Sequence, residues 1–195
     1  AWAPLVPLLA PHRELLILDL PGHGASAAEE DSGTFAGLVR SVRAFIEAQG
    51  LAGIDMVGSS LGARVVLELA WQGGVGAVVA LDPGSFWQGW ERTYAGTSLA
   101  ASAALLRLSK PLIPALAHNP VSRSALLAQL SARPWALDGG LVERELKSLA
   151  ETRTVDALIA DLTTAPAQEG PAAPDSGPIV IGWGAHDHLC LPQQA

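Results

Sequence analysis

Cysteine is almost absent from this sequence. Cys190 is the single cysteine among 195 residues, so no internal disulfide can form and a disulfide-framed secreted domain is excluded. One cysteine is compatible with a reducing compartment. We therefore expect a cytoplasmic protein in which Cys190 serves packing.

Positive charge is also scarce. Lysine and arginine total 12 against 19 aspartates and glutamates, which gives a net charge of -7. No stretch of the chain concentrates the basic residues. This balance argues against a nucleic-acid partner and disfavours binding to anionic membranes.

Long apolar runs are missing as well. A membrane span needs about 18 or more consecutive apolar residues. The most apolar stretch of this chain is interrupted by charges at Arg107 and Lys110 and by two prolines soon after. We therefore expect no membrane span.

The sequence does contain enough apolar material for one domain. Hydrophobic residues make up 49% of the chain and charged residues 16%, which predicts a large core and excludes disorder. Two independent domains are not expected at this length. The first residue is Ala1 and the single methionine is Met56, so we expect a piece of a longer protein.

Apolar runs alternate with amphipathic segments in the first part of the chain. Strands are predicted over residues 15–18, 54–57 and 75–81, and helices over residues 1–10, 35–49 and 61–71. Strands and helices that alternate through short links are typical of a parallel α/β sheet with right-handed crossovers.

The pattern changes after residue 84. No buried strand is predicted before residue 163, and helical spacing recurs over residues 97–109, 121–132, 141–151 and 155–162. Residues 163–177, rich in Pro, Ala and Gly, predict a flexible link, and residues 178–183 a further strand. The chain thus divides into a core segment (1–84), a helical insertion with its link (85–177) and a second core segment (178–195).

Ser60 lies in a pattern typical of a sharp strand-to-helix turn. The run VGSSLGA, residues 57–63, follows one predicted strand and opens a predicted helix. A side chain at the apex of such a turn has a strained backbone, and we expect its neighbours Gly58 and Gly62 to be needed because they carry no side chain. The helix start directs N–H groups at an oxyanion formed there. The alternative is that Ser59 or Ser60 only caps the helix.

Three aspartates also follow predicted strands. They are Asp19, Asp82 and Asp187. In open α/β sheets, ligands bind beyond the carboxyl ends of the strands. The three carboxylates and Ser60 can therefore share one cleft.

Three motifs, in order, resemble signatures of the α/β-hydrolase family. DLPGHG at residues 19–24 resembles the loop after the family's fourth strand, GSSLG at 58–62 its nucleophile elbow, and PIVIGWGAHD at 178–187 its seventh strand with the acidic residue. The resemblance covers about residues 1–84 and 178–195. It implies a mostly parallel sheet with flanking helices, and a helical lid inserted before the penultimate strand.

The resemblance also implies roles for individual residues. Ser60 would be the nucleophile, the Leu61 N–H part of the oxyanion hole, and Asp187 the acid that orients a histidine base. Asp82 is the alternative acid. The resemblance implies no cofactor and no metal. The family's histidine follows an eighth strand that we do not find, so we expect the chain as given to lack the triad histidine and to be inactive.

Serine at the elbow favours attack on an acyl carbon, because haloalkane dehalogenases and epoxide hydrolases of the family have aspartate there. We expect a carboxylesterase-like serine hydrolase that forms an acyl-enzyme with a small apolar ester-like substrate. The alternatives are a non-catalytic small-ligand-binding protein, and an acyltransferase or C–C hydrolase. Trp87, Trp90 and Trp135 either line an acyl pocket or form the insertion's own core. His186 and His188 alone make an incomplete metal site.

Overall fold

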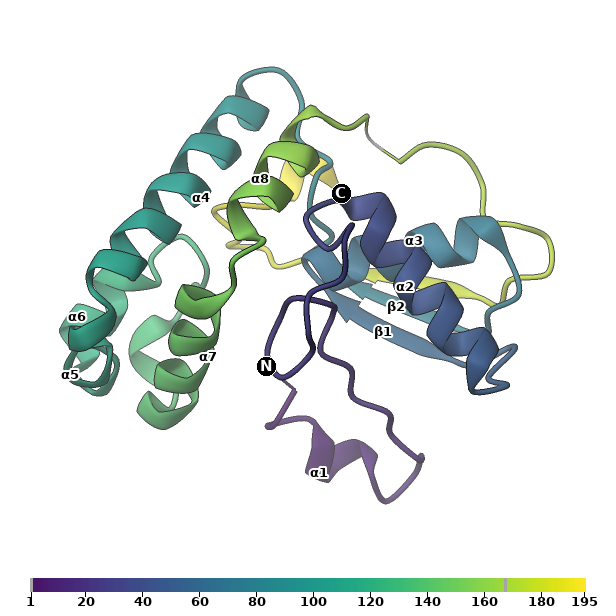
Figure 1. Ribbon diagram of the computed structural model, residues 1–195, viewed down its shortest axis with the longest axis horizontal. Coiled ribbons are helices and arrows are strands. Elements are labelled where there is room, and N and C mark those ends of the chain that lie inside the picture. The colour runs from purple at the N-terminus through teal and green to yellow at the C-terminus, as the bar shows by residue number, and fades with distance from the viewer. Residues whose placement is uncertain (1, 167) are drawn as a thin grey trace.

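A three-stranded parallel sheet is the centre of the computed structural model, which describes residues 2–166 and 168–195 (Figure 1). The strands are β1 (Met56–Ser59), β2 (Val78–Leu81) and β3 (Ile179–Gly182), in that order across the sheet. Ser59 pairs with Leu81, and Leu81 with Gly182. All three strands therefore end level, and the residues that follow them lie at one edge.

Helix α3 (Leu61–Gln72) packs directly on β1 and β2, and α2 (Phe35–Ala48) packs on α3. Leu38, Leu69 and Val78, one from each layer, have no exposed surface. Apolar residues at steps of three and four form the buried stripes of both helices, as the sequence predicts. Gly50, with φ of +63°, follows the end of α2.

A group of helices lies between β2 and β3 in the sequence and beside the sheet in Figure 1. Its elements are α4 (Trp90–Leu108), η1 (Lys110–Leu112), α5 (Ile113–His118), α6 (Pro120–Leu126), η2 (Pro134–Ala136), α7 (Gly139–Glu151) and α8 (Val155–Thr164). Helices α4 to α7 have an apolar cluster of their own around Ile113 and Leu146. The Arg123 guanidinium is buried there and donates to the carbonyls of Ala117, Pro134 and Trp135.

Helix α8 is attached to the sheet side as well. Leu158 belongs to the same apolar cluster as the buried residues of α2, α3 and β2. The Asp161 carboxylate accepts a hydrogen bond from the Phe35 amide at 2.8 Å, so α8 helps to cap α2. The helical insertion and the core thus share part of one core.

The strand predicted over residues 15–18 is not formed. Leu16, Ile17 and Leu18 are extended and between 42% and 55% exposed. An extended segment becomes a strand only when a neighbouring strand pairs with its amides and carbonyls, and among the described residues none does. Before it, the predicted first helix shortens to α1 (Val6–Leu9).

The segment after α8, predicted as a flexible link, is instead bonded to α3. Gln168 donates to the Glu68 carboxylate at 2.7 Å, and Ser176 donates to the Ala70 carbonyl at 2.6 Å. Asp175 accepts from the Gly74 amide just beyond the helix. The remaining element is the short η3 (Pro192–Gln194) at the end of the chain.

Within residues 2–166 and 168–195, no single helix combines the length and apolar character of a membrane span. Helix α4 meets that test only together with Lys110–His118, as a pair bent by 71°.

Candidate active site

Ser60 occupies the turn between β1 and α3. Its φ of 53° and ψ of -116° lie in a region that non-glycine residues rarely adopt. Its amide donates to the Leu81 carbonyl at 2.9 Å, and its carbonyl accepts from the Arg64 amide at 3.1 Å. The residue is exposed, and its side chain caps no amide of α3. The hydroxyl is therefore not used as a helix cap.

The two glycines that flank Ser60 are not equivalent. A Cβ atom on Gly58 would lie 2.2 Å from the Gly62 carbonyl oxygen and 2.6 Å from the Ala63 nitrogen. A Cβ on Gly62 would meet nothing within 4 Å. The expectation that both positions must be free of side chain is thus wrong for Gly62, because its Cβ direction points into open space rather than between the two arms of the turn.

The backbone of Leu61 and that of Gly84 lie close to the Ser60 side chain. Leu61 is the first residue of α3, so its N–H is one of the four that have no acceptor inside the helix. The positive end of the helix dipole lies at the same place. A Cβ on Gly84, in the turn after β2, would lie 3.9 Å from the Ser60 Oγ. An anion formed at Ser60 would therefore lie next to an amide that has no acceptor inside α3.

Asp82 and Asp187 are neighbours at the level edge of the sheet. The Asp82 Oδ1 accepts from the Gly184 amide at 2.5 Å, while the Asp187 Oδ1 accepts from the amides of Leu189 and Cys190 at 2.7 Å each. A Cβ on Gly184 would be 3.3 Å from the Asp82 Oδ1 and 3.8 Å from the Asp187 Cβ. The two aspartate side chains thus flank one glycine, and each has one carboxylate oxygen that accepts from the backbone.

Residues with strained backbone conformations also lie at this edge of the sheet. Among the described residues, the non-glycine residues with positive φ are Ser60, Asp82 and Ser85. Ser85 is buried, and its hydroxyl has no hydrogen-bond partner. Such conformations cost about 1–3 kcal/mol each and cluster at functional sites. The sequence carries no signal for the strain at Asp82 and Ser85, although each lies beside a proline or glycine.

The pKa of the Cys190 thiol is affected by the charges at this edge of the sheet. It is 2% exposed and packs with Trp87 and Leu189. Burial, assisted by the negative charges of Asp187 and Asp82, raises the pKa of the Cys190 thiol to about 12. The thiol is therefore unreactive at neutral pH while it stays buried.

Asp19 does not join this group. Its carboxylate accepts from the Ala25 amide at 2.9 Å, and its carbonyl accepts from the Ser26 hydroxyl at 2.7 Å. A Cβ on Gly24 would overlap the Asp19 carboxylate. Asp19 therefore closes its own loop, and the expectation that it shares a cleft with Ser60, Asp82 and Asp187 stays a prediction.

Three of the five histidine side chains have other partners. His23 contacts the Pro21 carbonyl, His118 the Glu143 carboxylate and His188 the Ala128 carbonyl. In the part of the chain that the structure describes, no histidine ring hydrogen-bonds to Ser60, Asp82 or Asp187, and no three side chains are grouped to hold a metal.

The tryptophans of the insertion separate into two kinds. Trp87 is 4% exposed and donates to the Leu189 carbonyl at 3.0 Å, whereas Trp90 and Trp135 are 66% and 58% exposed. Trp87 is thus part of a small core, and neither exposed ring belongs to one.

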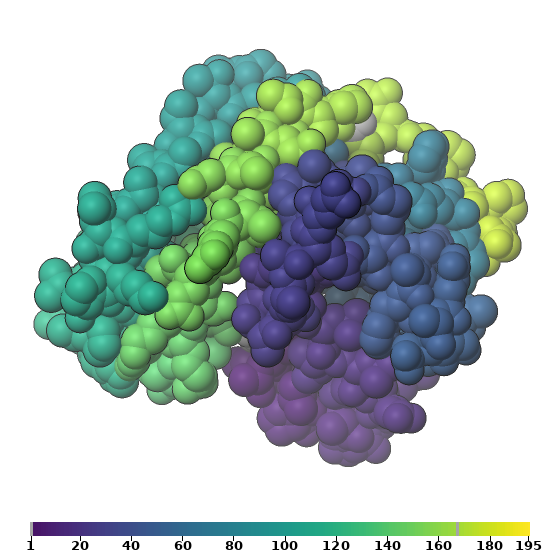
Figure 2. Space-filling view, viewed as in Figure 1, coloured from purple at the N-terminus to yellow at the C-terminus, as the bar shows by residue number. Residues whose placement is uncertain are grey.

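Two cavities lie along the insertion. One of about 570 Å³ is lined by charged side chains that include Arg107, Lys110 and Arg153. The other, of about 330 Å³, separates α7 from Gly22 and Gly24, along the boundary between the green and dark purple segments in Figure 2. Neither is lined by Ser60, so these cavities belong to the insertion and not to the serine turn.

Comparisons with known proteins agree with this fold. A model of the alpha/beta hydrolase family matches residues 1–195. No curated protein matches the sequence. Among solved structures, a hydrolase from Pseudomonas aeruginosa is similar, with a TM-score of 0.68 and 22% identity over 99% of this chain and 69% of that chain. An N-formylmaleamic acid deformylase from Pseudomonas putida has a TM-score of 0.63 and 14% identity, over 99% and 71%. At these identities the likeness concerns the fold.

Proposed function

The chain belongs to the alpha/beta hydrolase family, and from that premise we propose that it is a serine hydrolase in which Ser60 attacks an ester-like acyl carbon. The observation that carries the proposal is the conformation of Ser60, with φ of 53° at the junction of β1 and α3 and a hydroxyl that caps nothing. Strain of this kind at an exposed serine has no use in packing. A nucleophile held at a strand-to-helix turn requires such a conformation, so this observation supports the proposal.

The reaction has two steps. The Ser60 Oγ forms a bond to the acyl carbon and gives its proton to a base, while the carbonyl oxygen becomes an oxyanion beside the Leu61 N–H. Collapse of this intermediate breaks the bond to the leaving alcohol, which takes the proton from the base. Water then attacks the acyl-enzyme in the same way and releases the acid.

Asp187 is the acid in this proposal. Two amides hold its Oδ1, which leaves Oδ2 to accept a hydrogen bond from a histidine and to stabilise the imidazolium. Asp82 stays the alternative, since its Oδ2 is not tied either. Its Oδ1 fixes the start of the loop at Gly184, a role that is structural.

The base is a histidine. None of the described contacts joins one of the chain's histidines to Asp187 or Ser60, so we propose that it comes from outside residues 1–195 and that this chain alone is inactive. The helical insertion, residues 85–177, is the lid in this proposal. The absence of a histidine contact also favours the second candidate, a non-catalytic protein that binds a small ligand on the same fold.

The experiment compares Ser60→Ala with Ser59→Ala in the full-length product of the gene that encodes this chain. Ser59 ends β1, is exposed and precedes the turn, so it is a matched control. Hydrolysis of p-nitrophenyl acetate and butyrate should fall at least about 10³-fold in Ser60→Ala and change little in Ser59→Ala. An N-formyl amide completes the panel because one structural neighbour is named a deformylase.

Covalent labelling gives the second readout. A fluorophosphonate should add to Ser60 in the wild type and in Ser59→Ala, and mass spectrometry of the labelled peptide locates the adduct. Labelling that persists in Ser60→Ala would reject the nucleophile. Full-length protein that folds, binds small esters and neither labels nor turns over would support the binding protein.

A further inference from the structure

The loop that carries Asp187 is held by groups from outside it. Residues 184–194 follow β3 and Trp183 and run toward the N-terminal end of α4, as the yellow segment of Figure 1 shows. The Asp187 amide donates to the Gly184 carbonyl at 3.1 Å, while its carboxylate accepts from the amides of Leu189 and Cys190. The position of its carboxylate therefore depends on what fixes these two residues.

Two indoles fix them. The Trp87 Nε1 donates to the Leu189 carbonyl at 3.0 Å, and the Trp183 Nε1 donates to the Cys190 carbonyl at 2.8 Å. The same two residues thus give their amides to Asp187 and their carbonyls to tryptophans. Trp87 precedes α4 and Trp183 follows β3, so the loop is gripped from the insertion on one side and from the sheet on the other.

An apolar cluster buries the Trp87–Leu189 bond and partly buries the Trp183–Cys190 bond. Trp87, Ala95, Leu189 and Cys190 are all at most 8% exposed, and Trp183 packs against them. A hydrogen bond that water cannot reach is stronger than an exposed one, and its loss leaves a buried carbonyl unpaired. The indole bonds therefore hold the loop more firmly than surface bonds would.

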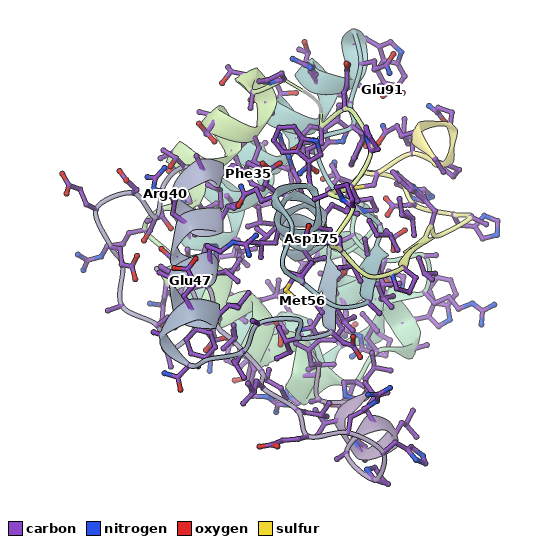
Figure 3. The ribbon with its side chains drawn as sticks, turned by 90° about the vertical axis from the view of Figure 1, so that its right-hand side faces the viewer. Phe35, Arg40, Glu47, Met56, Glu91 and Asp175 are labelled. Atoms are coloured by element: carbon purple, nitrogen blue, oxygen red, sulfur yellow. The ribbon has the colours of Figure 1, made fainter. Side chains whose placement is uncertain are left out.

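The insertion grips the loop again on both sides of this cluster. The buried Glu91 carboxylate accepts from the side-chain amides of Gln193 and Gln194 at 3.0 and 2.8 Å. Figure 3 labels Glu91 at the end of α4 that faces the yellow turn of η3. Tyr94, one turn further along α4, donates to the His188 carbonyl at 3.2 Å. The first turns of α4 are thus bonded to the loop at its middle and at its end.

We propose that Trp87 and Trp183 are positioning residues for Asp187, and that the insertion, through Trp87 and Glu91, makes the orientation of the acid depend on where the insertion lies. The proposal rests on the proposed function in so far as Asp187 is the catalytic acid. A displacement of the insertion would loosen the Leu189 and Cys190 amides and, with them, the carboxylate.

We call the hydrogen bonds of Trp87 and Trp183 to Leu189 and Cys190 the indole clamp. The single cysteine, Cys190, can be used to test this clamp without introducing a label. Cys190 is buried inside it and, with a pKa of about 12, reacts with iodoacetamide only when the loop opens. Trp87→Phe and Trp183→Phe keep an aromatic ring but remove the N–H donor. Each should raise the alkylation rate of Cys190 at least about fivefold and speed hydrogen exchange of the Leu189 and Cys190 amides.

The matched control is Trp135→Phe. It makes the same chemical change at a ring that is 58% exposed, and it should leave both rates unchanged. Folding of each variant is checked by circular dichroism. If Trp87→Phe does not fold, the isosteric variant Glu91→Gln takes its place in the test. Alkylation and exchange rates equal to those of the wild type in the folded variants would overturn the clamp.

The positioning role is tested separately in the full-length protein. Trp87→Phe should lower kcat about tenfold and leave KM within about twofold, because an acid that is misplaced affects the transition state and not substrate binding. Faster alkylation with an unchanged kcat would overturn the positioning role. An inactive wild type would reject the proposed function, while the alkylation and exchange rates still decide the clamp.

Discussion

Gly58 and Gly62, on either side of Ser60, differ in the space that each leaves for a side chain. This difference gives the sharpest test of the serine turn. Gly58→Ala and Gly62→Ala add the same methyl group to the same motif, four residues apart. The structure predicts opposite outcomes, because the added Cβ would lie 2.2 Å from the Gly62 carbonyl oxygen in the first variant and in open space in the second.

The magnitude follows from the contacts. A carbon and a carbonyl oxygen ordinarily stay at least about 3.3 Å apart, so Gly58→Ala must move backbone by roughly 1 Å. Overpacking that the backbone must absorb costs about 3 kcal/mol, which lowers Tm by roughly 6–12 °C in a chain of this length. Gly62 lies in the first turn of α3, where Ala is favoured over Gly by about 0.5–1 kcal/mol. Gly62→Ala should raise Tm by roughly 1–4 °C.

Calorimetry and urea unfolding at pH 7 measure both effects in the chain itself. In the full-length protein, Gly58→Ala should also lower esterase turnover about 100-fold, since a shift of 1 Å at the nucleophile has that effect. A Gly58→Ala variant that melts within about 1 °C of the wild type would refute the turn geometry. A loss of stability in Gly62→Ala as large as in Gly58→Ala would refute it equally.

Two further outcomes are expected. Arg123→Met removes a buried guanidinium that serves three carbonyls and should cost about 2–4 kcal/mol in urea unfolding, whereas the exposed control Arg133→Met should cost little. Burial alone would raise the pKa of Glu91, but hydrogen bonds from Gln88, Gln193 and Gln194 outweigh it and hold that pKa below its ordinary value. The stabilisation is present above the ordinary pKa and lost as pH falls through the lowered one. The stability gap between wild type and Glu91→Gln should therefore shrink below about pH 4, and a constant gap would contradict this assignment.

The sequence predicts the parallel sheet and the inward face of α3 correctly, because both depend on local periodicity. Val65, Leu69 and Ala70 are buried as their spacing requires. The membership in the alpha/beta hydrolase family and the fold class are confirmed. The roles of Ser60, Leu61 and Asp187 stay predictions, supported by a motif and by local geometry.

What the sequence could not supply depends on partners far along the chain. Residues 15–18 have the apolar pattern of a strand but no strand to pair with among the described residues. Residues 163–177 have the composition of a free link, yet Gln168 and Ser176 find acceptors on α3. The hydrogen bond from Trp87 to Leu189 joins positions 102 residues apart, and no local sequence pattern predicts it.

The order of the strands also governs how the protein is made. Strand β2 leaves the ribosome before the whole helical insertion, and its neighbour β3 after it, so that Asp82 and Gly184 meet across 102 residues. At a synthesis rate of about 5–20 residues per second, β2 waits on the order of 5–20 s for that neighbour. During this interval its unpaired edge can bind a strand of another nascent chain. The acid loop forms only after β3, so a chain that mispairs at β2 does not assemble the sheet edge that carries Ser60 and Asp187.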